Sequence, residues 1–292
     1  MSRRVRGVIV LAAAIVVAGL GLVAERLIAA GSRDAAVGAR SLRVCADPNN
    51  LPFSNQRLEG FENRLATIVA GELHANLEYT WWAQRRGYVR NTIQAGLCDV
   101  LMGAPSGFER TLVTRPYYRS SYVFVSRSVD QLQVRSFDDP ILRRLRIGVQ
   151  LVGNDGQNTP PAHALADRGV VANLVGYTLY GNYLDPNPPA RIVEAVARGD
   201  VDVAVVWGPL AGYFAPRQST PLALQSVTPQ VDRNGMPLAF DIGVGVSPKL
   251  PAVRDEIDHV LVRRRADIAR LLDEFGVPRV TPSPSAGGRH VR

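Results

Sequence analysis

The chain contains the same helix, turn and strand junction twice, about a hundred residues apart. In each copy a helical pattern ends at a glycine that can adopt the left-handed conformation, an acidic residue opens an apolar strand, and a second glycine ends it. The copies are residues 93–103, with Gly96, Asp99 and Gly103, and residues 196–208, with Gly199, Asp202 and Gly208. This repetition predicts two similar units and therefore two lobes. The alternative is chance similarity, because any α/β protein reuses such junctions.

Strands and helices alternate around each copy. The first unit has expected strands at 42–46, 77–82 and 98–102, with helices at 60–75 and 87–95. The second has expected strands at 145–150, 171–179 and 201–207, with helices from about 160 and at 189–198. Such an order implies parallel strands with right-handed crossovers. The predicted fold class is α/β with two lobes, in which mostly parallel sheets are flanked by helices and a cleft lies between the lobes.

The remaining segments complete the predicted organisation. Residues 117–129 are β-rich and are expected to cross between the lobes, while Asn234-Gly235 predicts a tight turn between apolar runs at 222–228 and 238–246. Residues 252–275 predict one long amphipathic helix. The predicted domains are a leader at 1–31, a linker at 32–41, lobe 1 at 42–126 plus 229–276, lobe 2 at 127–228, and a disordered tail at 277–292.

Residues 1–31 have the form of an export leader. Three arginines at positions 3, 4 and 6 precede an apolar run at 8–24, which is intermediate between a signal-peptide core and a minimal membrane helix. Cleavage after the small residues at 29–31 and retention as a membrane anchor both stay open. In either case the rest of the chain is exported to the periplasm, and only this segment contacts the membrane. A buried core helix is the other interpretation, but it would normally carry a polar stripe.

Export places the two cysteines in an oxidising compartment. Cys45 and Cys98 are the only pair available, and an oxidising compartment favours a disulfide between them. Their spacing fits neither a thioredoxin-type redox site nor a metal site. A bond here would close a loop of about fifty residues and stabilise the fold by roughly 3 to 4 kcal/mol. Two buried free thiols are the alternative.

The charge balance argues against nucleic acid as a partner. Lys and Arg number 34 against 26 Asp and Glu, which gives a net charge of +8, and Lys249 is the only lysine. A nucleic-acid binder would gather its basic residues into a stripe with interleaved aromatic residues, whereas these arginines are scattered. The chain is long and 46% hydrophobic, so it can bury one or two large cores.

The candidate binding residues lie in the loops that follow four of the predicted strands. Ligands of open α/β sheets bind beyond the carboxyl ends of the strands, so the loops after residues 46, 102, 150 and 206 should converge on one cleft. The predicted cleft residues are Asp47, Asn50, Phe53, Ser106, Arg110, Tyr117, Asn154, Asp155 and Trp207.

Within this set Arg110 is the strongest candidate for ligand contact. A guanidinium in a cleft can hold a carboxylate through two parallel hydrogen bonds. The alternative is that Arg110 pairs with Glu109 or Asp99 at the rim. Phe53, Tyr117 and Trp207 could wall the cleft, although aromatic residues beside strand ends more often belong to the core.

The sequence shows no catalytic constellation. Its histidines, at positions 74, 163, 259 and 290, have no metal-ligand spacing. Ser106 lacks the context of a nucleophile elbow. Asp47 and Asp155 are the only candidates for acid-base chemistry in a cleft enzyme such as a lyase. We therefore predict a protein that is not an enzyme, with no catalytic residue, no metal and no cofactor.

Several motifs resemble a known family. Residues 52–54 (Pro-Phe-Ser), 60–62 (Gly-Phe-Glu), 109–110 (Glu-Arg) and 114–117 (Thr-Arg-Pro-Tyr) resemble the extracellular solute-binding proteins of amino-acid ABC transporters, solute-binding family 3. This resemblance implies the periplasmic-binding-protein type II fold. It also implies that Arg110 holds the α-carboxylate of a ligand.

Longer motifs narrow the resemblance to one branch. Residues 45–54, 148–150, 158–165, 183–191 and 205–213 look like the quinoprotein-dehydrogenase-associated branch, which includes the J-type accessory proteins of methanol-oxidation gene clusters. The branch implies a periplasmic quinoprotein alcohol or methanol dehydrogenase, dependent on pyrroloquinoline quinone, as the partner that this protein helps to mature or activate.

The chain departs from amino-acid receptors at residues 152–161, where an insertion replaces their short Gly-Thr turn. The cleft could therefore take a peptide segment of the partner. A transport receptor for an amino acid or small carboxylate is the alternative function.

Overall fold

The computed structural model describes residues 40–152, 158–180 and 183–281. The predicted leader at 1–31, nearly all of the linker and residues 282–292 lie outside this part of the chain. Among the described residues, no helix has the length and apolar character needed to cross a membrane.

The first predicted unit is present. Its strands β1 (Ser41–Ala46), β4 (Asn76–Trp81) and β5 (Val100–Pro105) are parallel, and β1 lies between the other two. Helix α2 (Phe61–Glu72) connects β1 to β4. The helix predicted at 87–95 is wrong in extent, because α3 covers only Tyr88–Asn91. The hydroxyl of Thr92 donates to the Tyr88 carbonyl, and Thr92 then leaves the helical conformation.

The second unit repeats this arrangement. Strands β8 (Ile147–Gln150), β9 (Leu174–Tyr177) and β10 (Val203–Trp207) are parallel, with β8 in the middle. Helix α4 (Pro160–Ala166) precedes β9, and α5 (Arg191–Arg198) precedes β10. The βαβ pattern predicted from the sequence is therefore confirmed in both halves.

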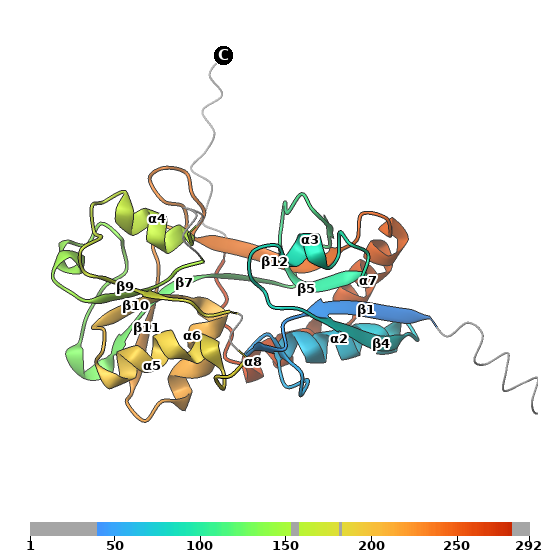
Figure 1. Ribbon diagram of the computed structural model, residues 1–292, viewed down its shortest axis with the longest axis horizontal. Coiled ribbons are helices and arrows are strands. Elements are labelled where there is room, and N and C mark those ends of the chain that lie inside the picture. The colour runs from blue at the N-terminus through green and yellow to red at the C-terminus, as the bar shows by residue number, and fades with distance from the viewer. Residues whose placement is uncertain (1–39, 153–157, 181–182, 282–292) are drawn as a thin grey trace, which may run out of the picture.

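Two long strands join the halves, as Figure 1 shows. Strand β7 (Tyr118–Arg127) pairs through residues 118–121 with β12 (Ala239–Val246), and through 122–127 with β10 and β11 (Leu222–Ser226). Strand β12 continues along β5 in the first half. Hydrogen bonding thus runs without a break through the order β4-β1-β5-β12-β7-β10-β8-β9. The two-lobed class is confirmed, whereas the boundaries at 126 and 228 stay predictions.

The smaller elements complete the lobes. Strands β2 (Asn49–Asn50) and β3 (Ser54–Asn55) form a hairpin, and β6 (Leu112–Val113) pairs with β12. The remaining elements are the helix α6 (Gly208–Phe214) and the 3-10 turns at Ser128–Asp130, Pro140–Arg143, Pro188–Ala190 and Ala215–Arg217.

The long C-terminal helix predicted at 252–275 is wrong as a single element. It consists of α7 (Pro251–Arg263) and α8 (Arg265–Glu274), which meet at Arg264. The apolar pattern skips the arginines at 263–265, and the break lets both apolar faces reach the same core. At this break, Arg263 and Arg264 pair with Glu72 of α2.

Residues 277–281 of the predicted disordered tail are also packed. Val277 is buried at 5% exposure, and the Val280 N–H donates to the Arg119 carbonyl at 3.1 Å. The tail therefore continues into the fold at least as far as Thr281, whose carbonyl accepts from Gln230. The rest of the predicted tail falls outside the described residues.

The repeated junction has the same hydrogen bonds in both halves. Asp99 accepts from the backbone N–H and the guanidinium of Arg43, and the Arg43 guanidinium also donates to the Gly96 carbonyl. Asp202, Arg146 and Gly199 repeat every one of these contacts. Gly96 and Gly199 have φ angles of 74° and 79°, so the predicted left-handed conformation is confirmed. The two copies of the repeated sequence therefore form the same local structure.

We expect Asp99→Asn and Asp202→Asn to lower the free energy of unfolding by about 1 kcal/mol each, because a charge-assisted hydrogen bond at a partly exposed site is lost. Since the two sites share no partner, the double variant should lose the sum. Urea unfolding of the two single variants and the double variant measures this. A double variant no less stable than either single variant would contradict it.

Candidate functional site

The loops after the strands of both lobes meet around a cavity of about 120 Å³, hereafter the interlobe cavity. Lobe 1, the joining strands β7 and β12, and lobe 2 all contribute side chains to its wall. The lining residues are Asn50, Phe53, Glu62, Gln84, Gly103, Tyr118, Tyr180, Trp207 and Ile242. A larger cavity of about 620 Å³ lies beside α7 and α8. We place the candidate site in the smaller one, because it lies where the carboxyl ends of the strands converge.

Asp47 holds the first loop in place behind the cavity. Its carboxylate accepts from the backbone N–H of Asn49 at 2.8 Å and of Gln84 at 2.6 Å. Burial raises the pKa of Asp47, while these hydrogen bonds act in the opposite direction. Asp47 thus joins the loop after β1 to the segment after β4, and it does not line the cavity.

Asn50 and Phe53 come from the same loop and do line the cavity. The Asn50 side chain donates to Gln84 Oε1 at 2.8 Å, and Asn50 is only 1% exposed. Its Oδ1 atom is buried and has no hydrogen-bond partner. The Phe53 ring lies 5.4 Å from the Phe61 ring, so it packs on the lobe 1 core at the base of the loop.

Glu62 supplies the only carboxyl group among the lining residues, and its sequence context predicts no role for it. It lies in the first turn of α2, where its N–H donates to the Phe53 carbonyl at 2.9 Å. A Cβ atom at Gly103 would stand 2.2 Å from Glu62 Oε1, so any larger residue there would push this carboxyl out of its place. Burial raises the pKa of Glu62 to about 8. Its carboxyl group therefore holds its proton to a higher pH than an ordinary glutamate does.

Aromatic rings line much of the rest of the cavity. Burial and the neighbouring Glu62 raise the pKa of Tyr118 well above its ordinary value, against a hydrogen bond from Trp207. The Trp207 ring contacts Tyr122 at 5.3 Å between centroids. Tyr180 faces the cavity from lobe 2 and is hydrogen-bonded to Gln150.

The predicted residue Tyr117 lies one position away from the cavity-lining Tyr118. Tyr117 immediately precedes β7 and lines the larger cavity, whose wall also includes Tyr118. Its hydroxyl donates to the Met102 carbonyl at 2.9 Å.

Arg110 and Ser106 are exposed on the loop after β5 and do not line the interlobe cavity. Asp99, one of the alternative partners of Arg110, is bound to Arg43. Within the described ranges Arg110 makes no ion pair with Glu109 or any other residue. The predicted residues Asn154 and Asp155 fall in 153–157, outside the described residues. The binding roles of all the predicted cleft residues stay predictions.

The lobes also touch through Asn49, which is the neighbour in sequence of the cavity-lining Asn50. The Asn49 side chain donates to the Asp185 carbonyl at 2.8 Å. Asp185 belongs to the motif at 183–191 that carried the narrower resemblance.

In the portion of the chain that the structure describes, no three His, Cys, Asp or Glu side chains are grouped as a metal site.

Comparison with known proteins decides the family. No family model matches the chain. Protein MoxJ of Methylorubrum extorquens is 34% identical over 251 residues, which cover 82% of this chain and 82% of that protein. The chain belongs to the MoxJ family. MoxJ of Paracoccus denitrificans is 31% identical over 83% of this chain and 90% of its own length.

A solved structure of a relative agrees with this MoxJ assignment. The periplasmic binding protein XoxJ from Methylobacterium extorquens AM1 is 33% identical to this chain. The match covers 82% of this chain and 100% of the XoxJ chain, with a TM-score of 0.67. The resemblance stated from the motifs is therefore confirmed, and this MoxJ-family chain has the fold of a periplasmic binding protein.

Proposed function

We propose that this MoxJ-family protein is a non-enzymatic periplasmic accessory protein that binds a methanol or alcohol dehydrogenase dependent on pyrroloquinoline quinone and aids its maturation or activation. The observation that carries the proposal is the interlobe cavity. Its volume of about 120 Å³ is below the roughly 300 to 1,000 Å³ of ordinary ligand pockets. No arginine or lysine is among its lining residues, so it offers no cation to an α-carboxylate.

The cavity also gives little support to catalysis. Its single carboxyl group, Glu62, has no second carboxyl group, histidine or lysine beside it among the lining residues. Asp47, the other candidate, uses its oxygens to accept backbone hydrogen bonds. General acid-base chemistry usually needs a group free to exchange a proton with the substrate.

The charge of the chain suits an acidic partner. A net charge of +8 should speed association with a negatively charged dehydrogenase, and added salt should screen that attraction. We expect purified protein to bind the purified dehydrogenase, with an affinity about tenfold weaker in 0.5 M than in 0.05 M NaCl. Surface plasmon resonance at the two salt concentrations measures this.

A deletion strain tests the role in cells. Cells without the gene should lose methanol dehydrogenase activity, and re-expression of the protein should restore it. Failure to bind the purified dehydrogenase, together with unchanged activity in the deletion strain, would refute the proposal.

The second candidate is a receptor for an amino acid or small carboxylate. The specific observation in its favour is Arg110, which is exposed on the loop after β5 and makes no ion pair with any described residue. An amino acid that raises the Tm of the wild type, but not of Arg110→Ala, would favour this function by mass action.

A further inference from the structure

The interlobe cavity combines aromatic walls with one carboxyl group. The rings of Phe53, Tyr118, Tyr180 and Trp207 line it, and Glu62 is its only acidic residue. Aromatic faces attract cations, and the attraction is strongest where water is excluded. A negatively charged ligand would meet no positive partner among the lining residues, so the walls favour a cation.

Asn50 adds an independent observation. It is 1% exposed, and its amide nitrogen is already used by Gln84 Oε1. Its Oδ1 is left buried without a donor. Burying an unpaired acceptor costs roughly 1 to 3 kcal/mol, so a natural protein seldom keeps one unless something fills it. The missing group is therefore a hydrogen-bond donor.

We propose that the interlobe cavity binds an alkylammonium group, with the Glu62 carboxylate as its counter-ion and Asn50 Oδ1 accepting one of its N–H bonds. The volume of about 120 Å³ equals roughly four water molecules, which suits an ammonium with a short alkyl chain. This inference rests on the proposed function for its biological setting, but its chemistry depends only on the cavity.

The alkylammonium group can come from two sources. One is a free small amine such as methylammonium, and the other is a lysine side chain of the partner dehydrogenase. A four-carbon amine, n-butylammonium, represents the lysine side chain. The two probes therefore separate the two sources in the same assay.

The protonation of Glu62 predicts how binding depends on pH. Because an ammonium ion pairs with the ionised carboxylate, it must displace the proton that burial keeps on Glu62 below pH 8. Affinity should therefore rise about tenfold between pH 6 and pH 7 and level off above pH 8. The tyrosines that interact with Glu62 stay neutral in this range, because burial raises the pKa of Tyr79, Tyr88, Tyr117, Tyr118 and Tyr180. Asp47 is the other carboxyl group nearby, and backbone N–H groups of Asn49 and Gln84 hold it.

The test is isothermal titration of the full chain with methylammonium and n-butylammonium at constant ionic strength. Methanol and 1-butanol serve as neutral controls of matched size. We expect the ammonium ions to bind and the alcohols not to bind. A stronger response to n-butylammonium would identify a lysine side chain as the source, and an equal or stronger response to methylammonium would identify a free amine.

Variants locate the site. Glu62→Gln keeps the size of the side chain but cannot ionise, and it should weaken ammonium binding at least tenfold. Glu109→Gln removes an exposed carboxylate from the same lobe and should bind like the wild type. Gly103→Ala puts a methyl group against the Glu62 carboxyl and should also weaken binding. Urea unfolding confirms that each variant is folded.

Absence of ammonium binding, equal binding of the alcohols, or unchanged binding in Glu62→Gln would each overturn the inference. These outcomes are separate from failure of the proposed function. If the dehydrogenase is captured while no ammonium binds, only this inference fails. If ammonium binds while the dehydrogenase is not captured, only the accessory role fails.

Discussion

Replacing Arg168 by methionine is expected to lower the free energy of unfolding by about 3 to 5 kcal/mol. Arg168 is 6% exposed at its side chain, and it donates to the carboxylate of Asp232 at 2.7 and 3.1 Å. The Asp232 side chain is 2% exposed. Methionine keeps the length of the side chain but leaves this carboxylate buried without a positive partner. Urea unfolding at pH 7 measures the loss.

The same guanidinium holds three segments of the chain together. It also donates to Asp138 at 2.8 Å and to the Ala164 carbonyl at 3.0 Å, and it lies 5.9 Å above the Phe137 ring. An exposed arginine from the same region gives a matched control. Arg144→Met removes one positive charge without a described partner and should change stability by less than about 0.5 kcal/mol.

A double variant separates the charge effect from lost packing. Adding Asp232→Asn to Arg168→Met removes the uncompensated carboxylate, so part of the lost stability should return. If the double variant loses the sum of the two single losses, the pairing of Arg168 with Asp232 is not the cause.

The stability that the ion pairs of Arg168 contribute should decrease as the pH falls. Burial alone would raise the pKa of Asp232, but hydrogen bonds from Arg168 and the Arg233 backbone outweigh it and lower that pKa. A hydrogen bond from Arg168 lowers the pKa of Asp138 as well. Carboxyl groups with lowered pKa values stabilise the wild type above their ordinary pKa of about 4, and this stabilisation is lost as the pH falls. The gap between wild type and Arg168→Met should therefore shrink between pH 7 and pH 3.

The parallel strands of both lobes could be predicted because their signals are local. An apolar run between a glycine and an acidic residue specifies a strand wherever it occurs, and the shared contacts of Asp99 and Asp202 show that both copies form the same junction. The break between α7 and α8 was missed because amphipathic periodicity reports the buried face and not the straightness of the helix. The arginines at 263–265 interrupt the apolar spacing and were the available signal.

The candidate site could be predicted only in part. Asn50, Phe53 and Trp207 lie on the cavity because the carboxyl ends of parallel strands meet in one place. Tyr118 was missed by one residue, since the phase of a strand decides which face a side chain takes. Glu62 resembles an ordinary acidic residue in the first turn of a helix. Its carboxyl lies against Gly103, some forty residues away in another element, and a contact of that kind has no local signature.

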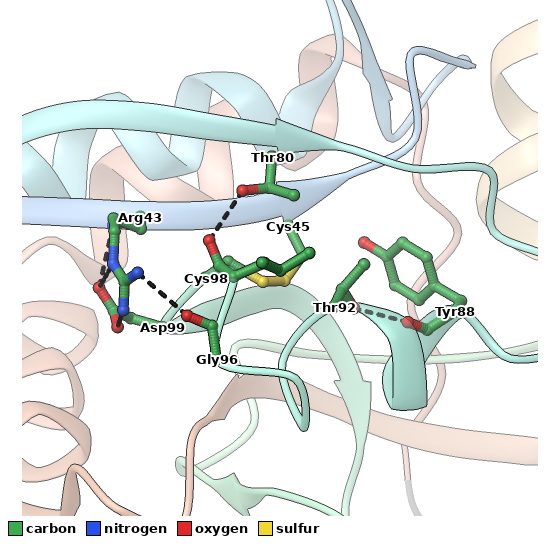
Figure 2. Close-up of a disulfide and its surroundings, with 9 residues drawn as sticks. Arg43, Cys45, Thr80, Tyr88, Thr92, Gly96, Cys98 and Asp99 are labelled. Carbon is green, nitrogen blue, oxygen red and sulfur yellow. Dashed lines mark hydrogen bonds and ion pairs between the residues drawn. A yellow bond between two sulfur atoms is a disulfide. The ribbon is translucent and has the colours of Figure 1, made fainter.

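Removal of the disulfide is the other change that we expect to lower the stability of the fold strongly. Cys45 of β1 and Cys98 are bonded as predicted, with their Cα atoms 5.6 Å apart and a sequence separation of 53. Both are buried beside Ile93 and Leu101. Figure 2 shows the bond flanked by the ion pair of Arg43 with Asp99 on one side and by Thr92 and Tyr88 on the other.

Replacing Cys45 and Cys98 together by alanine should lower the free energy of unfolding by about 4 kcal/mol, because the unfolded chain regains the entropy of the open loop. For a chain of this size the Tm should fall by roughly 8 to 16 °C. Reduction of the wild type with dithiothreitol should produce a loss of similar size, whereas the double variant should not respond to the reagent.

Because the bond lies within lobe 1, the junction of Arg146 with Asp202 in lobe 2 is a matched control. Asp202→Asn should lower the free energy of unfolding by the same amount in the oxidised and the reduced protein. Equal stability of the oxidised and reduced wild type would show that the close packing of β1 against the start of β5, and not the covalent bond, holds this loop.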